Sequence, residues 1–360
     1  MRMLIATGGT GGHIYPALAL ADAARNRYKD VEILFVGNDD RMESVEVPAH
    51  GYAFRALHAS GLTGNPIQKA KAITLMIKAY RKALHIIDEF HPDIAIGFGG
   101  YVSAPVMLAA HKRKVKTMIH EQNSIVGVSN KLVAKKMDGI VICYEKCFEE
   151  FGIKRTRLLG NPRATSAVHV KFDETYYKSL GLSLSKPTIL VVMGSLGSTS
   201  VNEMMKDALP EIDSKYQVLF VTGKNNYKEM KAAVHQKHIV VVDYVKQLDI
   251  MEHVDLIVCR AGATTAAEIT ALGTPSILIP SPYVAHNHQF YNASVLVEKH
   301  AAFMIEEKDL NAKTLVSKID MIMKNDELRK KMRENALALG KPNASEDILN
   351  WCEEMVKVKR

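Results

Sequence analysis

His13 is the residue best suited to chemistry, because it closes a glycine-rich loop at the start of an expected helix. The loop, Gly8-Gly-Thr-Gly-Gly-His13, lets the backbone turn sharply, and the free N–H groups of the following helix favour a phosphate. Its spacing matches neither the dinucleotide-binding pattern nor the P-loop pattern. The helix terminus also favours a neutral imidazole. His13 therefore either accepts a proton from a hydroxyl group or simply caps the loop.

A second strand, loop and helix offer groups suited to a nucleotide sugar. The run from Asp255 ends a strand at Gly262 and then starts a helix with small residues, whose N–H groups can hold a diphosphate. Glu268 in the first turns of that helix either accepts two ribose hydroxyls or merely complements the helix dipole. Downstream, His286-Asn-His-Gln289 groups side chains that read hydroxyl patterns well.

A metal-chelating D-x-D motif is missing from the chain, so we expect neither a metal nor a cofactor. A leaving diphosphate would then be neutralised by helix N-termini and by a cation such as Arg163. The four cysteines have no metal-ligand spacing, which predicts reduced thiols without zinc or disulfides. The first residues lack the apolar region of a secretory signal, so we expect a cytosolic chain.

Apolar runs alternate with amphipathic stretches along the chain, which predicts an α/β fold with parallel sheets covered by helices on both faces. Each half opens with a strand, a glycine loop and a helix, so we expect two Rossmann-like domains that face each other across a cleft, the default ligand site. A polar segment, 163–187, separates the two sets of strands. The expected strands begin at Met3, Val31, Ile94, Thr117, Gly139, Thr188, Gln217, Ile239, Leu256 and Ser276.

The composition is that of a globular protein, and its charge is uneven. Of 360 residues, 47% are hydrophobic and 24% are charged, which excludes disordered, collagen-like and disulfide-scaffold chains. The length fits two domains. Residues 1–160 carry +7 of the net charge of +8. This asymmetry suggests an anionic partner such as nucleic acid, an acidic membrane or a phosphorylated substrate, although ordinary solubilising charge also explains it.

Seven motifs, in order from end to end of the chain, resemble the MurG family of GT-B glycosyltransferases. They are Gly8-Gly-Thr-Gly-Gly-His13, Gly99-Gly-Tyr-Val-Ser103, His120-Glu-Gln-Asn123, Gly160-Asn-Pro162, Gly194-Ser-Leu-Gly197, Arg260-Ala-Gly-Ala-Thr-Thr-Ala-Ala-Glu268 and His288-Gln289-x-x-Asn292-Ala293. The resemblance implies an acceptor domain of residues 1–162 with a returning helix, 345–360, and a donor domain of residues 163–344.

The resemblance also implies an activity. It is an inverting, metal-independent transfer of N-acetylglucosamine (GlcNAc) from UDP-GlcNAc to the 4-hydroxyl of N-acetylmuramic acid in undecaprenyl-linked lipid I. The product is lipid II for peptidoglycan synthesis, and nucleic acid is not an expected partner.

The resemblance assigns roles to single residues as well. UDP-GlcNAc would contact Thr10, Gly11, Gly12, Asn123, Arg163, Ser195, Val245, Ala263, Thr264, Thr265, Glu268 and Gln289. The acceptor would contact Gly8, Gly9, Gly99, Gly100 and Tyr101. His13 is the candidate base, and Glu121 is the less favoured one because it can instead orient a loop by hydrogen bonding. The family pattern Gly-Asn-Pro-Val-Arg is here Gly-Asn-Pro-Arg163, with the arginine displaced by one position.

Two other classes of function compete with this one. A GT-B relative could glycosylate diacylglycerol or epimerise UDP-GlcNAc at C2, and a binding subunit would hold the nucleotide sugar without turnover. The His120 and Gly99 motifs favour lipid I as acceptor, and the intact His13 argues against a binding-only protein.

A lipid-linked acceptor requires the enzyme to dock on the membrane. We expect peripheral binding to the anionic inner leaflet, on the cytoplasmic face, through apolar residues of one helix and a basic cluster. A core-facing helix flanked by solvated lysines would give the same pattern. The expected membrane residues are Ile73, Met76, Ile77, Tyr80, Lys112, Arg113, Lys114 and Lys116.

Overall fold

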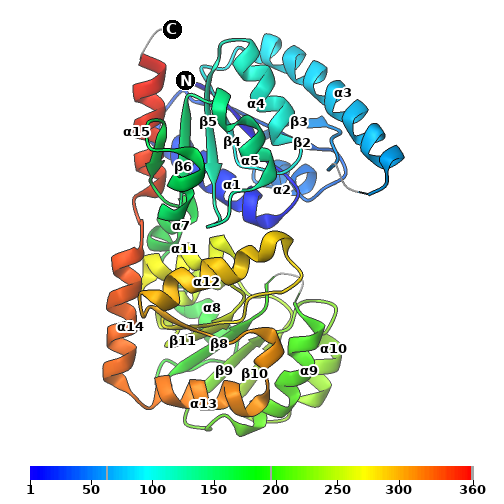
Figure 1. Cartoon of the computed structure of the whole chain (residues 1–360). Helices are drawn as coiled ribbons and strands as arrows, with labels where there is room; N and C mark the ends of the chain where they lie inside the picture. The colour runs from blue at the N-terminus through cyan, green and yellow to red at the C-terminus, as the bar shows by residue number, and fades with distance from the viewer. Residues whose placement is uncertain (62–63, 195–196, 358–360) are drawn as a thin grey trace. The chain divides into compact units, whose positions relative to one another are not determined.

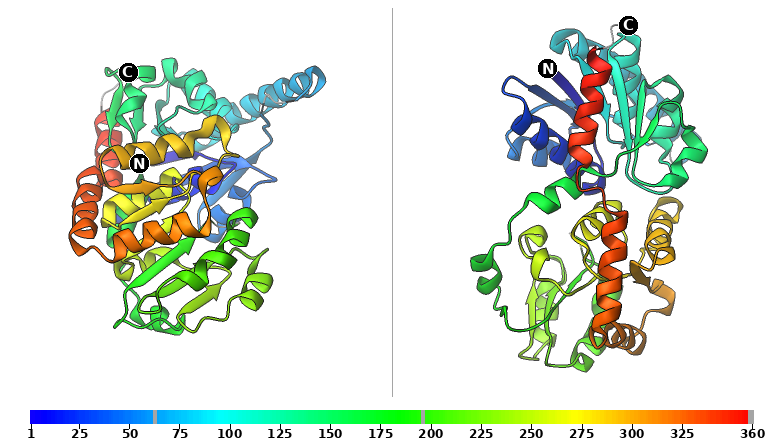
Figure 2. Two further views of the ribbon diagram at one scale, coloured as in Figure 1. Left: turned by 60° about the horizontal axis from the view of Figure 1, so that its bottom comes forward. Right: turned by 90° about the vertical axis from the view of Figure 1, so that its left-hand side faces the viewer.

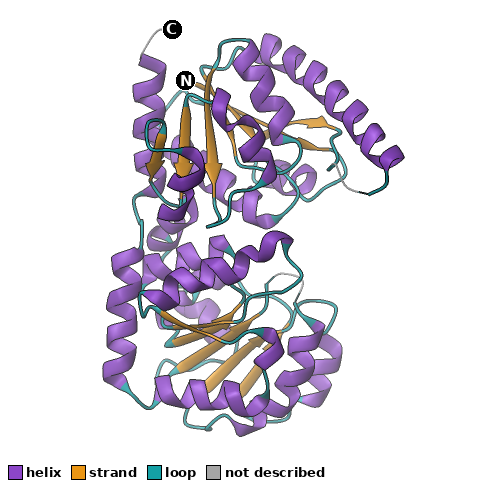
Figure 3. Ribbon diagram, viewed as in Figure 1, coloured by secondary structure: helices purple, strands orange, loops and turns teal. Residues whose placement is uncertain are grey.

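The computed structural model describes residues 1–61, 64–194 and 197–357, which form two compact units. The N-terminal unit comprises Met1–Thr165 with Asn343–Arg360, and the C-terminal unit comprises Ser166–Pro342. Each unit has one parallel sheet with helices around it, so the expected two-sheet α/β fold is confirmed (Figures 1 and 3).

The N-terminal sheet has seven strands in the order β3-β2-β1-β4-β5-β6-β7. The strands are β1 (Arg2–Ala6), β2 (Glu32–Asn38), β3 (Ala53–Leu57), β4 (Ile94–Gly97), β5 (Lys116–Glu121), β6 (Gly139–Ile142) and β7 (Thr156–Leu158). The inner strands are apolar and buried on both faces, as parallel strands between helix layers must be. The two edge strands, β3 and β7, are additions to the predicted set.

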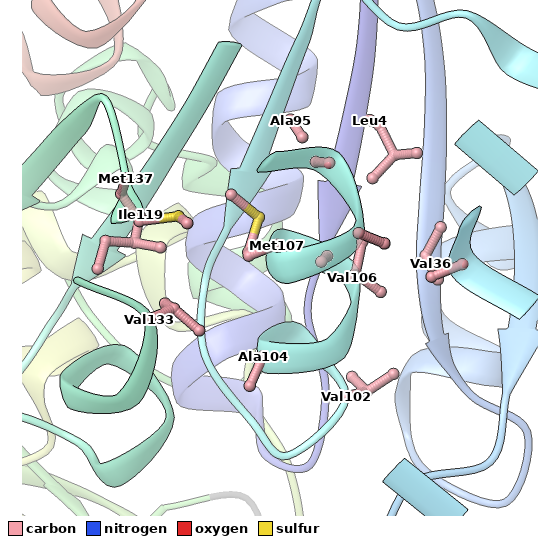
Figure 4. Close-up of a cluster of buried hydrophobic side chains, with 14 of the residues drawn as sticks. Leu4, Val36, Ala95, Val102, Ala104, Val106, Met107, Ile119, Val133 and Met137 are labelled. Carbon is pink, nitrogen blue, oxygen red and sulfur yellow. The ribbon is translucent and has the colours of Figure 1, made fainter. Parts of the chain in front are cut away.

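Helices cover both faces of this sheet. On one face, α3, α4 and α5 pack over a core whose centre is drawn in Figure 4. On the other face lie α1, α2 and α15. The helices of this unit are α1 (Gly11–Arg27), α2 (Glu43–Ala49), α3 (Pro66–Phe90), α4 (Ser103–Lys112), α5 (Val128–Val133), α6 (Phe148–Phe151) and α15 (Ala344–Lys357), and α7 (Pro162–His169) leads into the next unit.

The last helix, α15, belongs to the N-terminal unit and is drawn in red in Figure 1. Its Trp351 packs so closely over β6 that a Cβ at Gly139 would lie 3.0 Å from the indole ring. Glu353 forms an ion pair with Arg27 at 2.7 Å and accepts a hydrogen bond from Tyr28 at 2.6 Å. The expected amphipathic helix is therefore present, and α1 and β6 are what it packs against.

The C-terminal sheet has six strands in the order β10-β9-β8-β11-β12-β13. The strands are β8 (Thr188–Val192), β9 (Gln217–Val221), β10 (Ile239–Val242), β11 (Leu256–Cys259), β12 (Ser276–Leu278) and β13 (Ala302–Met304). The helices are α8 (Glu174–Ser179), α9 (Thr199–Ala208), α10 (Tyr227–Ala233), α11 (Ala263–Leu272), α12 (His288–Glu298), α13 (Ala312–Met323) and α14 (Asp326–Leu339). Of these strands, β13 was not predicted.

The apolar residues predicted for the α3 stripe do not share one environment. Met76 and Tyr80 are half-buried and pack against the core, so they are not free to enter a membrane. Ile73 and Ile77 are 51% and 49% exposed. The N-terminal half of α3 projects from the rest of its unit (Figure 2). Within the described residues, no helix has the length and apolar character needed to span a bilayer.

The basic cluster after α4 is weaker than its sequence suggests. Arg113 is held by Asp88 through two charge-assisted hydrogen bonds of 2.6 and 2.5 Å, so its charge is already offset. Lys112 and Lys114 are exposed, and Lys116 begins β5 half-buried. The exposed positive charge of this cluster therefore comes mainly from Lys112 and Lys114.

Candidate functional site

Two glycine turns meet at the carboxyl edge of the N-terminal sheet, because the strands that precede them, β1 and β4, are neighbours. Gly8 and Gly9 follow β1, and Gly99 and Gly100 follow β4. Gly9, Gly99 and Gly100 have φ values of 93°, 100° and 81°, which favour glycine. A Cβ at Gly100 would lie 2.3 Å from the Gly8 carbonyl oxygen, so the two backbones touch.

The predicted acceptor residues therefore lie together, and His13 joins them. A Cβ on Gly99 would lie 3.0 Å from the His13 Nε2 atom, which places the imidazole directly against that turn. Tyr101 is 51% exposed, and its ring lies over Gly61. The turn, the base candidate and an exposed aromatic ring thus surround one small region of the unit.

His13 is held as a neutral imidazole with a defined tautomer. Its Nδ1 lies 3.0 Å from the carbonyl oxygen of Gly8, and because a carbonyl only accepts, Nδ1 carries the proton. Nε2 is left with a lone pair. Burial lowers the pKa of His13, while the Gly8 bond and the Glu43 carboxylate oppose that shift. The side chain can therefore accept a proton at neutral pH.

Glu121 is the buried last residue of β5, and its carboxylate is bound to a loop. It accepts hydrogen bonds from the backbone N–H groups of Asn123 (3.1 Å) and Gly127 (2.9 Å), and from the Asn130 side chain (2.9 Å). Burial raises its pKa, and these bonds oppose the shift. The arrangement is that of a loop-orienting residue, and it holds the segment that carries Asn123.

His120 joins two parts of the same edge rather than facing a ligand. It is 1% exposed, its Nε2 donates to the Gly160 carbonyl oxygen at 3.0 Å, and its ring stacks on Phe98. Burial lowers the pKa of His120 to about 4, so it stays neutral. Two of the motifs noted in the sequence, at 120–123 and 160–162, are thus linked by one hydrogen bond.

Three of the donor residues predicted in the N-terminal unit lie at the start of α1, and Asn123 lies in the loop after β5. Thr10 is its N-cap residue, and Gly11 and Gly12 form its first turn. The Arg163 guanidinium lies over the ring of Tyr15 at 5.9 Å, and that ring packs against Gly11. Arg163, although displaced by one position in its motif, still lies beside the glycine loop.

The C-terminal unit contains a cavity of about 620 Å³ beside the N-terminus of α9. Gln289 lies in its wall, and its side-chain oxygen accepts a hydrogen bond from the backbone N–H of Ser281 at 2.9 Å. Arg260, at the end of β11, supplies a cation to the wall. The described lining residues are Met193, Gly194, Gly197, Ser198, Thr199, Ser200, Arg260, Ser281, Tyr283 and Gln289.

The other predicted donor residues of this unit gather at the start of α11, outside the cavity lining. Glu268 is 4% exposed and accepts a hydrogen bond from Gln247 at 3.2 Å, which brings the loop after β10 to this helix. Val245 in that loop buries its side chain in the core, so only its backbone is available to a base. Ala263, Thr264 and Thr265 form the first turn of α11. Ser195 lies outside the described residues.

Two supporting residues were missed from the sequence. Glu43 is fully buried and accepts hydrogen bonds of 3.0 Å from Gly9 N–H and Asn38 N–H. A Cβ at Gly8 would lie 2.2 Å from this carboxylate, so the glycine is required. Arg260 begins one of the seven motifs but has no predicted role, although its position between an apolar strand and a helix start is a signal for a cation at the site.

Both units match models of one protein family. The Glycosyltransferase family 28 N-terminal domain matches residues 3–142, and the Glycosyltransferase family 28 C-terminal domain matches residues 188–348. A curated relative from Limosilactobacillus reuteri subsp. reuteri is 40% identical over 358 residues, covering 97% of each chain. That relative is named UDP-N-acetylglucosamine–N-acetylmuramyl-(pentapeptide) pyrophosphoryl-undecaprenol N-acetylglucosamine transferase.

Solved structures share the fold. The crystal structure of Acinetobacter baumannii MurG matches with a TM-score of 0.80 at 24% identity, covering 98% of this chain and 99% of that one. A UDP-N-acetylglucosamine 2-epimerase described as putative, from Listeria monocytogenes, matches with a TM-score of 0.74 at 14% identity, over 100% and 98% of the two chains. The fold alone therefore does not separate a transferase from an epimerase.

Replacing Glu43 with alanine should destabilise the N-terminal unit. The change leaves the buried Asn38 N–H without an acceptor, which costs about 1–3 kcal/mol, and it also removes the partner of the partly buried Gly9 N–H. We expect a lower urea midpoint for the Glu43→Ala variant, measured by circular dichroism. Glu46→Ala, on the same helix but only partly buried, is the control and should unfold like the wild type. Equal midpoints for both variants would show that the glycine turn does not depend on Glu43.

Proposed function

The chain belongs to glycosyltransferase family 28, and we propose that it transfers GlcNAc from UDP-GlcNAc to the 4-hydroxyl of N-acetylmuramic acid in lipid I. The main structural support for this reaction is a neutral His13 imidazole, which packs against two glycine turns that contact each other. The 40% identity to a full-length N-acetylglucosamine transferase supports the choice of sugar and acceptor.

In the proposed mechanism, His13 acts as the general base. Its Nε2 lone pair accepts the proton of the acceptor hydroxyl as the oxygen attacks the anomeric carbon, while Nδ1 stays bonded to Gly8. Attack from the face opposite to UDP inverts the anomeric configuration. The leaving diphosphate gains negative charge, which helix N-terminal N–H groups and Arg163 would stabilise.

Donor binding is proposed for the C-terminal unit. The start of α11 offers N–H groups beside small side chains, and the buried Glu268 lies close enough to the loop after β10 for one ligand to contact both. We assign the ribose to Glu268, uracil to the backbone of Val245, and the sugar to Gln289. Acceptor binding is assigned to the glycine turns and Tyr101 of the N-terminal unit.

The carboxylates beside the glycine turns argue against epimerisation. A 2-epimerase would need acid and base carboxylates that face the sugar, whereas Glu43 and Glu121 are bonded to backbone N–H groups of their own unit. His13 is a base suited to a hydroxyl acceptor, which favours transfer.

We propose that the protein acts as a peripheral enzyme on the cytoplasmic face of the cell membrane. Ile67, Ile73 and Ile77 are large apolar residues exposed on α3, and exposed lysines lie on the same helix. An amphipathic helix of this kind binds the interface between headgroups and acyl chains, and nearby lysines add attraction to anionic lipids. This docking would bring the acceptor domain to a substrate whose lipid tail stays in the bilayer.

The purified protein should transfer labelled GlcNAc from UDP-GlcNAc to lipid I in detergent and leave diacylglycerol unmodified. UDP should appear only when lipid I is present, because the attacking hydroxyl belongs to the acceptor. Thin-layer chromatography of the lipid fraction and a coupled UDP assay measure both. Labelled diacylglycerol, or formation of the 2-epimer of UDP-GlcNAc without acceptor, would assign the chain to one of the competing functions.

The His13→Ala variant should lose about 10² to 10⁴ in turnover, the usual contribution of general-base catalysis, with little change in UDP-GlcNAc affinity. In the wild type, kcat/KM should fall as the pH drops through the pKa of His13, because only the unprotonated imidazole accepts a proton. Burial lowers that pKa, so the fall should lie below pH 6.5. His50→Ala, an exposed histidine, is the control. Near-wild-type turnover of His13→Ala would transfer the role to another group.

An Ile73→Glu/Ile77→Glu variant should bind anionic vesicles about ten-fold more weakly than the wild type, because it removes apolar burial and adds repulsion. Vesicle flotation at low salt measures this. Lys112→Glu/Lys114→Glu/Lys116→Glu should weaken binding too, with Arg113 left in its ion pair.

Ile153→Glu is the matched control, since Ile153 is 77% exposed in a loop outside α3. Equal flotation of the wild type, the control and the α3 variant would contradict this docking surface.

A further inference from the structure

Four side chains form a closed ring in and behind the wall of the C-terminal cavity. Arg260 donates a hydrogen bond to the Ser198 hydroxyl (2.8 Å) and forms an ion pair with Glu307 (2.8 Å). Ser200 donates to the other Glu307 oxygen (2.6 Å), and the two serine hydroxyls lie 3.3 Å apart. The ring thus connects the end of β11, the first turn of α9 and the segment after β13.

The two charges of the ring are largely removed from water. The side chains of Arg260 and Glu307 are only 12% and 14% exposed. A second bond, from Arg260 to the Ile279 carbonyl oxygen at 3.1 Å, fixes the guanidinium further. Because an isolated charge is costly in such a place, each partner holds the other in position. Glu307 does not line the cavity, whereas Arg260, Ser198 and Ser200 do.

The ring changes how α9 begins. Ser198 is the N-cap residue of this helix, a position where serine usually accepts a bond from an N–H of the first turn. Its side chain makes no such capping bond and is bonded to Arg260 instead. The first-turn N–H groups are therefore not satisfied by the cap side chain, and this turn borders the cavity.

We propose that Glu307 is a positioning residue for the donor nucleotide, a conclusion that rests on the proposed function. It holds Arg260 and Ser200, and through them it keeps the first turn of α9, which borders the cavity, in the conformation in which its N–H groups bind the UDP diphosphate together with those of α11. Glu307 itself touches no substrate. Its carboxylate also offsets the charge of Arg260, so the role of Arg260 here is to connect Glu307 to Ser198.

The test compares variants that break the ring without changing its charge. Glu307→Asp is too short to reach both partners, and Ser200→Ala removes one link. We expect each variant to raise the Kd for UDP, measured by calorimetry, by about ten-fold, with a matching rise in KM for UDP-GlcNAc. The kcat and the KM for lipid I should stay close to wild type. Ser200→Thr keeps a hydroxyl at this position and should therefore bind UDP like the wild type.

Glu306→Asp is the control, because this neighbouring carboxylate is more exposed and forms its ion pair with Lys308, outside the ring. Thermal unfolding of each variant shows whether the unit stays folded. Wild-type affinity for UDP in Glu307→Asp and Ser200→Ala would overturn the proposal, and so would an equal rise in the KM for both substrates. If the wild type itself fails to bind UDP, the proposed function is wrong, a result distinct from failure of the ring alone.

Discussion

The contact between two glycine turns is the constraint on which the N-terminal site depends. A Cβ at Gly100 would collide with the Gly8 backbone, and a Cβ at Gly8 would collide with the Glu43 carboxylate. Glu43 holds the first turn by accepting a hydrogen bond from the Gly9 N–H, and the His13 ring packs against Gly99 of the second turn. The imidazole therefore lies between the turn that supplies its carbonyl partner, Gly8, and the turn against which its ring packs.

Much of the fold followed from apolar runs, because strands buried on both faces are continuous stretches of apolar residues. All ten predicted strands are present. The strands that escaped prediction, β3, β7 and β13, have partly exposed residues; Arg55 and Arg157 interrupt the first two, and β13 is only three residues long. The stripe expected on α3 divides between two environments: Ile73 and Ile77 are exposed, whereas Met76 and Tyr80 pack partly against the core.

The candidate site was predictable where each of its parts is a local pattern in the sequence. Glycine loops and helix starts are local patterns, and the structure brings the expected acceptor residues together. The supporting carboxylates Glu43 and Glu307 were not predictable, because their roles depend on partners far away in the chain. Glu43 lies 34 residues from Gly9, and an acidic residue at a helix start is ordinarily exposed. Glu307 reads as a surface residue beside Glu306 until its pairing with Arg260 is known.

The return of the chain to the N-terminal unit has a consequence for biosynthesis. The chain leaves this unit after Thr165 and re-enters it at Asn343. On the ribosome, the sheet face over Gly139 therefore stays without Trp351 until the whole second unit has been translated. During that interval apolar residues of β6 and α1 are uncovered, which is the condition under which nascent chains aggregate or recruit chaperones. The second unit, in contrast, is continuous and can fold as soon as it emerges.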